Sequence, residues 1–147
     1  MGFSVSGSAA IIFAAMFVGF GMFHSATVNG FETVSDAQQD RTDRTLVQQN
    51  TAIEIWSATW DGGAGELTVR ANNTGSTELS VDEVDLLADN RYVRGYDTSV
   101  GGDGATNLWL AQETLEITVT SLDADPGRVK LITGPGVAVT ASTAEVA

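Results

Sequence analysis

The chain has 147 residues, with 19 Asp and Glu against 7 Lys and Arg, and a formal net charge of −12 at pH 7. Nucleic-acid binding needs clustered Lys and Arg, because counterion release from the phosphates supplies much of the affinity, so this composition excludes that class of protein. There is no cysteine and one histidine, His24, which lies in an apolar segment. Disulfides, Cys-based zinc sites and thiol nucleophiles are therefore excluded, and a Ser-His-Asp triad or His-based metal cluster cannot be assembled.

An uncharged N-terminal segment predicts a membrane anchor. The first 31 residues contain no Asp, Glu, Lys or Arg, and Ala9–Phe23 is wholly apolar or glycine. Because a helix rises about 1.5 Å per residue, roughly 20 residues match a hydrocarbon core of about 30 Å, and we assign the anchor to residues 1–30. A cleaved signal peptide is the alternative, but no basic residue precedes the apolar run. His24 is expected at the membrane interface rather than in a proton relay.

The next segment is polar and predicts a helical stalk over residues 31–50. Residues 32–50 contain neither glycine nor proline. Asp40 precedes Arg44 by four positions, the order and spacing at which a carboxylate and a cation stabilise a helix. The apolar residues of the stalk form only a weak stripe, which favours a solvated extension over a seam for a partner helix. The N-terminal tail carries no Lys or Arg, so the sequence does not set the orientation across the membrane.

After Thr51 the apolar residues recur at every second position, which is the period of half-buried strands. Turn clusters rich in Gly, Asn and Asp separate these segments. The strands are expected near residues 53–55, 67–69, 84–88, 91–96, 115–119, 128–132 and 137–140, and the turns at 61–65, 72–76, 89–90, 101–104 and 125–127.

About seven short strands at this spacing predict an all-β, immunoglobulin-like β-sandwich over residues 51–147. The chain lacks the cysteine pair of true immunoglobulin domains, so Trp56, Trp60 and Trp109 are expected to supply the core together with β-branched residues. The alternative is that these tryptophans, with Tyr96, stack on a solute or glycan. That alternative would make the chain a membrane-anchored ligand-binding module.

Two acidic clusters are the only side-chain groups that resemble a reactive site: Asp82, Glu83 and Asp85, and Asp123 with Asp125. Neither has the ligand spacing of a calcium loop, and a solvated acidic surface is the favoured interpretation. The glycine-rich loop 101–104 lacks the Lys-Ser/Thr that follows in a phosphate cradle. We therefore assign no catalytic, cofactor or metal residue and predict that the chain is not an enzyme.

Asn72 begins an Asn-x-Thr sequon that ends at Thr74, placed where a strand is expected to end. Such a sequon is the acceptor pattern for N-glycosylation of a domain outside the membrane. Asn72 is therefore a candidate glycosylation site. A domain that is anchored and has no reactive site acts by contact, and an exposed sheet edge is the expected contact surface.

The order of several segments resembles a known family. The chain opens with Gly2-Phe3-Ser4-Val5-Ser6-Gly7 before Ile11-Ile12-Phe13, and a Gln-, Asp- and Arg-rich helix leads into Asn50–Ile55. The β-rich part carries Asn73–Ser80, Val84–Leu87, Trp109-Leu110 with Glu113–Leu115, and Arg128–Gly136. In this order the segments resemble the FlaF (ArlF) family of archaellum accessory proteins in its haloarchaeal form, over nearly the whole chain.

The resemblance implies a stator component of the motor of the archaellum, the archaeal flagellum. It implies a single-pass protein of the cell membrane, whose C-terminal domain lies between the membrane and the S-layer. The implied partners are the S-layer protein, a FlaG-type stator partner and a second copy bound through the sandwich. No binding residue is carried over, so the protein-contact residues stay unassigned.

A filament subunit of the archaellin or type IV pilin class is the alternative, because such subunits also join an apolar N-terminal helix to a β-rich head. Their precursors carry a basic residue just before the glycine at which they are processed. Neither Gly2 nor Gly7 is preceded by one. The sequence therefore favours the accessory protein.

The excess of carboxylates predicts a halophilic protein, because high salt screens their mutual repulsion. We expect the domain from Thr51 onward to lose structure as salt falls below roughly 1 M, where the Debye length is about 3 Å. Circular dichroism along a salt titration measures this loss. Structure that is unchanged down to low salt would contradict the interpretation.

Overall fold

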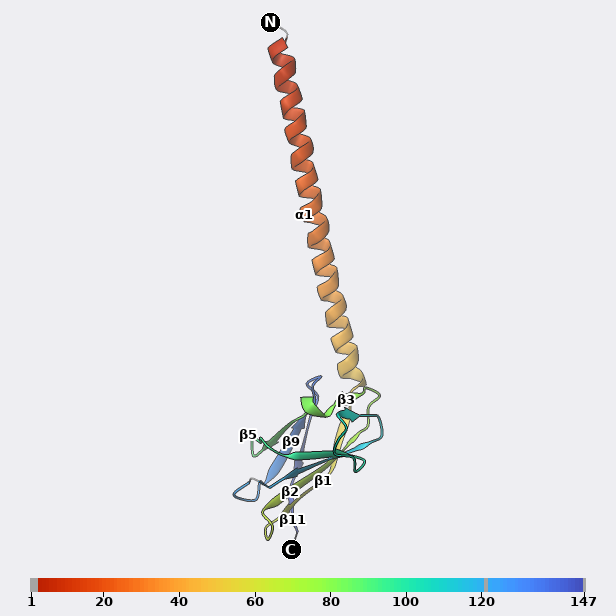
Figure 1. Cartoon of the computed structure of the whole chain (residues 1–147), viewed down its shortest axis with the longest axis vertical. Coiled ribbons are helices and arrows are strands. Elements are labelled where there is room, and N and C mark those ends of the chain that lie inside the picture. The colour runs from red at the N-terminus through yellow and green to blue at the C-terminus, as the bar shows by residue number, and fades with distance from the viewer. Residues whose placement is uncertain (1–2, 121, 147) are drawn as a thin grey trace. The chain divides into compact units, whose positions relative to one another are not determined.

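The computed structural model describes residues 3–120 and 122–146, and Gly2, one of the two glycines considered for processing, lies outside them. One helix, α1, runs from Phe3 to Asn50 without interruption (Figure 1). The chain divides into two compact units, Met1–Asp43 and Arg44–Ala147, so that about two turns of α1 belong with the strands. The division into an anchor, a stalk and a sandwich at residues 30 and 50 stays a prediction.

The N-terminal part of α1 has an apolar surface with nothing packed on it in this unit. Its large apolar side chains are exposed, up to 75% for Phe17, and the helix is long and apolar enough to cross a membrane. The hydroxyl of Thr27 donates to the carbonyl of Phe23 at 2.8 Å, so this polar group is satisfied within the helix, as a lipid environment requires. The ring of His24 stacks on that of Phe20, with 6.3 Å between centroids.

The second unit is built from strands in three sheets (Figure 1). All neighbouring strands are antiparallel except β11 and β1, which are parallel. The five-stranded sheet has the order β11 (Ala144–Val146), β1 (Ile53–Asp61), β2 (Glu66–Asn73), β8 (Thr114–Val119) and β6 (Asp97–Val100). The four-stranded sheet has the order β10 (Ala138–Ser142), β9 (Arg128–Ile132), β4 (Asp85–Ala88) and β5 (Arg91–Tyr92). A small sheet pairs β3 (Leu79–Ser80) with β7 (Leu108–Trp109), and the 3-10 turn η1 (Val81–Glu83) follows β3.

The inner faces of the two larger sheets share one hydrophobic core. Alternate residues of β2 and β8 are fully buried, among them Val69 and Ile117, and they meet buried residues of β4 and β9 such as Leu86 and Leu131. This alternation is the period-two pattern expected of strands with one face buried. The predicted all-β sandwich on an N-terminal helix is confirmed.

The tryptophans divide between the core and the surface. Trp60 is 6% exposed and Trp109 is fully buried, as predicted, and the indole nitrogen of Trp109 donates to the carbonyl of Glu113 at 2.9 Å. The prediction that Trp56 belongs to the core is wrong, because 55% of it is exposed. Trp56 lies on the outer side with Glu54, because Ile53 and Ile55 face the core, and the register shift between Ile55 and Ser57 then brings Ala58 and Trp60 inward.

Two edge regions also differ from expectation. The strand expected over residues 91–96 ends at Tyr92, and the chain turns through Gly95, whose φ is +74°, into β6. Strands β6 and β11 were not predicted, since both are short edge strands with little apolar alternation. The turn at Asp89 and Asn90 is confirmed, with φ of 48° and 65° that match a tight hairpin.

Candidate functional site

The connection between α1 and the sandwich is the most tightly built polar region of the second unit. A helix ends with carbonyl groups that have no partner within the helix. Here the loop of residues 74–77 supplies donors: the carbonyl oxygen of Asn50 accepts from the backbone N–H of Ser76 at 2.9 Å and of Thr77 at 3.3 Å. The sandwich itself therefore caps the helix, and we call residues 47–52 with loop 74–77 the junction.

Thr51 donates hydrogen bonds to two carbonyl groups in the last turn of α1. Its backbone N–H donates to the carbonyl of Gln48 at 3.3 Å, and its hydroxyl donates to that of Val47 at 2.7 Å. Thr51 is buried although it is polar, which is stable because its hydroxyl is hydrogen-bonded. Only Thr51 and Ala52 separate the end of α1 from the start of β1.

Gly75 makes the close approach of the loop to the helix end possible. A Cβ added at this position would lie 2.4 Å from the carbonyl oxygen of Asn50 and 2.5 Å from the backbone nitrogen of Ala52. The backbone N–H of Gly75 donates to the carbonyl of Ala52 at 2.9 Å. Only glycine fits here without moving the backbone, and this requirement comes from space rather than from a positive φ.

Asn73 holds the loop from the other side. Its side chain is fully buried at the end of β2. The amide nitrogen donates to the carbonyls of Thr77 at 2.8 Å and Trp109 at 3.2 Å, and the amide oxygen accepts from the N–H of Gly75 at 3.1 Å. A buried polar group with all these bonds made specifies one loop position, because any displacement would leave it unpaired.

A second contact ties the last turns of α1 to another loop. The side-chain amide of Gln48 donates to the carbonyl of Pro135 at 2.9 Å, a bond between positions 87 residues apart. These two residues line a hollow of about 340 Å³ with Arg44, Val47 and Gly134. The end of α1 is thus held by two separate loops of the sandwich.

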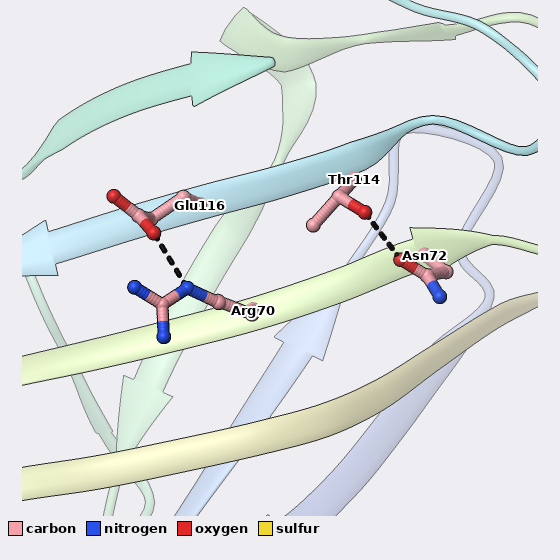
Figure 2. A network of polar contacts seen from close by, with 4 residues as sticks. All are labelled: Arg70, Asn72, Thr114 and Glu116. Atoms are coloured by element: carbon pink, nitrogen blue, oxygen red, sulfur yellow. Dashed lines mark hydrogen bonds and ion pairs between the residues drawn. The ribbon is translucent and has the colours of Figure 1, made fainter. Parts of the chain in front are cut away.

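The outer face of the five-stranded sheet carries the bulged Trp56. The guanidinium of Arg70 lies 5.9 Å from the centroid of the Trp56 ring, and Arg70 also pairs with Glu116 on β8 at 2.6 Å (Figure 2). Both charged side chains are about 40% exposed, so this pair contributes little to stability. The aromatic ligand site considered from sequence reduces to Trp56, because Trp60 and Trp109 are buried.

Asn72 lies on the same outer face, next to the pair just described. Its amide oxygen accepts a hydrogen bond from the hydroxyl of Thr114 at 2.7 Å, and Figure 2 shows its amide nitrogen on the side away from Thr114. The side chain is half-buried in the sheet. Glycosylation of Asn72 stays a prediction. The amide nitrogen would carry the glycan, whereas the hydrogen bond from Thr114 is made to the amide oxygen.

The two acidic clusters of the sequence lie apart in the fold. Asp82 and Glu83 lie on η1, whereas Asp123 and Asp125 line a hollow of about 360 Å³ together with Asp89. The carboxylate of Asp89 accepts from the backbone N–H of Gly127 and Arg128, both at 3.2 Å. Among residues 3–120 and 122–146, no three His, Asp or Glu residues are placed to hold a metal ion.

Asp85, predicted as part of the first cluster, instead faces outward from β4 beside Tyr92. A hydrogen bond with the Asp85 carboxylate, and its negative charge, raise the pKa of the Tyr92 hydroxyl above its usual value near 10. Burial raises the pKa of Tyr96, whose hydroxyl donates to the carbonyl of Val84. These tyrosines therefore serve as hydrogen-bond donors at neutral pH.

The junction was not predicted from sequence, although its parts were visible in it. The turn expected at 72–76 contains Asn73 and Gly75, but nothing in the sequence says that this turn packs against residue 50. Gln48 was assigned to a solvated stalk, and its partner Pro135 is distant in the chain. Within the second unit, the junction and the bond of Gln48 to Pro135 hold the last residues of α1 against the sandwich.

A long N-terminal helix that is apolar enough to cross a membrane, followed in the chain by a β-sandwich, defines the class of this fold as a helix with a β-rich head. The chain matches the model of the archaeal-type flagellin family over residues 2–143 and belongs to that family. Membership ties it to the archaeal flagellum, the archaellum. A comparison with curated proteins finds no match.

Two solved structures from Sulfolobus acidocaldarius are similar to this chain. The archaellum periplasmic stator protein FlaG is 17% identical, over 62% of this chain and 97% of that chain, with a TM-score of 0.46. The periplasmic stator protein complex of FlaF and FlaG is 16% identical, over 60% of this chain and 85% of that chain, with a TM-score of 0.41.

Replacing Gly75 should test the junction. We expect Gly75→Ala to force the loop away from Asn50 and to destabilise the second unit by about 1–3 kcal/mol, the usual cost of inserting a methyl group into a packed site. Gly62→Ala is the matched control, since its nearest neighbours lie at 3.6 Å or more. Denaturant unfolding of the full chain in detergent micelles measures both, and equal midpoints for the two variants would contradict the role of Gly75.

Proposed function

We propose that this protein is a non-enzymatic accessory component of the archaellum, a stator that anchors the motor by binding the S-layer from the membrane. Membership in the archaeal-type flagellin family supports the archaellum part of the proposal. The ordered segments that resemble FlaF support the accessory role. The observation that carries the mechanical role is the junction, where loop 74–77 caps α1 directly.

A stator has to pass a reaction force from a contact domain to an anchor. A flexible linker would absorb that force, because a chain free to rotate about its dihedrals transmits little load. Here two residues separate α1 from β1, and the helix end is bonded both to loop 74–77 and, through Gln48, to Pro135. Force applied to the sandwich therefore reaches residues 44–50 of the helix through hydrogen bonds and covalent chain.

The proposed location follows from the same parts. Residues 1–30 cross the cell membrane once, and the sandwich lies between the membrane and the S-layer. The exposed apolar surface of α1 supports insertion, since such a surface is costly in water. A FlaG-type protein and a second copy of the chain, bound through the sandwich, are the further proposed partners.

A filament subunit is the second candidate, and the family match favours it as much as it favours an accessory protein. In that function the apolar helix would pack with other helices in a filament core after processing. Gly7 is preceded by Ser6 and not by a basic residue, which argues against processing at that position. A membrane-anchored ligand-binding module is less well supported, since Trp56 alone offers an exposed indole.

The proposal is tested by binding. We expect the full chain in detergent micelles, immobilised in molar salt, to retain isolated S-layer protein specifically. A single-span protein of similar net charge is the control, because it reports adsorption driven by charge alone. Equal retention by the control, or recovery of the chain in purified filaments without S-layer binding, would count against the stator and favour the filament subunit.

A further inference from the structure

The outer face of the four-stranded sheet gathers two cations from β9 and a third from the segment that follows β5. Pairing of β4 with β9 places Leu87 opposite Lys130, and pairing of β4 with β5 places Leu87 opposite Tyr92. Arg128 lies two residues before Lys130 on the same face of β9, because side chains alternate along a strand. Arg94 stacks over the Tyr92 ring, 5.6 Å from its centroid. We call Leu87, Tyr92, Arg94, Arg128 and Lys130 the basic face.

This face is unlike the rest of an acidic protein. It carries three cations against one outward carboxylate, Asp85, a net charge of +2. The outer face of the five-stranded sheet carries one cation, Arg70, against five carboxylates, a net charge of −4; these are Glu54, Asp61, Glu66, Asp97 and Glu116. The two sides of the sandwich therefore have opposite charge although the whole chain carries −12.

The cations of the basic face form no ion pair among the described residues, although Arg94 stacks on the Tyr92 ring. No described carboxylate forms an ion pair with Arg94, Arg128 or Lys130, whereas Arg70 on the other sheet is paired with Glu116. The outward carboxylate Asp85 accepts its hydrogen bond from the Tyr92 hydroxyl instead. In a chain with 19 acidic residues, unpaired cations on one face leave their charge available to a partner.

A hollow on this face has the size and donors for carboxylate groups. Its volume is about 120 Å³, room for roughly four waters at the 30 Å³ of liquid water each. Leu87 contributes the apolar part of its lining, Arg128 and Lys130 contribute charged donors, and Asn90 and Thr140 contribute an amide and a hydroxyl. Charge-assisted hydrogen bonds from such donors are the strong means of binding a carboxylate.

We propose that the basic face is the surface through which the sandwich binds its wall partner, and that the partner presents an acidic protein surface whose carboxylates enter the hollow. The inference rests on the proposed function only for the identity of the partner, the S-layer protein. Tyr92, 53% exposed beside Leu87, supplies the aromatic contact typical of interface centres. At the salt that the fold is expected to need, the Debye length is about 3 Å, so complementary charge selects the acidic partner through groups in direct contact.

The test compares two double variants of the full chain in detergent micelles. Arg128→Gln/Lys130→Gln lowers the net charge by two on the basic face. Thr59→Glu/Thr118→Glu lowers it by the same amount on the outer face of the five-stranded sheet, on β1 and β8, two strands that do not pair with each other. Binding of S-layer protein is measured at the lowest salt at which circular dichroism shows all three proteins folded.

We expect the basic-face variant to weaken binding on the order of tenfold, as the loss of two surface charge contacts predicts, and the control to change it less than twofold. If S-layer binding is weakened equally in both variants, or in neither, the basic face is not the binding surface, while the stator proposal is left intact. Concentration-dependent self-association of the wild type that Arg128→Gln/Lys130→Gln prevents would make a second copy the occupant and overturn the wall partner.

If the wild type does not bind S-layer protein, the proposed function fails and fluorescent poly-glutamate decides the basic face. Binding of poly-glutamate that Arg128→Gln/Lys130→Gln weakens, and that Thr59→Glu/Thr118→Glu does not, supports an acidic protein partner. If the wild type does not bind poly-glutamate, or if both variants lose this binding equally, the proposal that the basic face binds an acidic protein is overturned.

Discussion

The capping of α1 by loop 74–77 is the interaction on which the rest of the second unit depends. It requires glycine at position 75, where any Cβ would meet the backbone at Asn50, and it requires the buried amide of Asn73 to hold the loop in place. Because Asn73 is also the last residue of β2, the helix end and the five-stranded sheet share one anchor point. The junction is thus built from hydrogen bonds between backbone and uncharged side-chain groups, which salt screening does not weaken as it weakens ion pairs.

Much of the fold could be predicted from the sequence because its signals are local. Period-two alternation located β2, β8 and β9, and Asp89 with Asn90 located a hairpin turn. The contacts that make the site are not local: Gln48 with Pro135, and Gly75 with Asn50, join residues that no sequence pattern connects. Trp56 was misplaced in the core although its alternation with Ile53 and Ile55 puts it on the outer face; what the sequence does not show is the register shift that lets Trp60 face inward on the same strand.

Charge shows the same difference between pattern and fold. The sequence correctly indicates a highly acidic protein with few scattered cations, but the scatter disappears when β4, β5 and β9 come together and bring Arg94, Arg128 and Lys130 to one face. A strongly acidic surface keeps the domain soluble and repels other acidic proteins. The basic face then gives such a domain a side from which an acidic partner can approach, as the proposed contact function requires.

The distinction between an anchor and a filament subunit is decided most directly by the intact mass of the protein isolated from its own cells. An accessory stator keeps its N-terminal segment, so we expect a chain that still contains the residues before Gly7, found in the cell-body fraction after filaments are sheared off. A mature chain that begins at or near Gly7 and is recovered in the sheared filaments would contradict the stator function and identify a filament subunit.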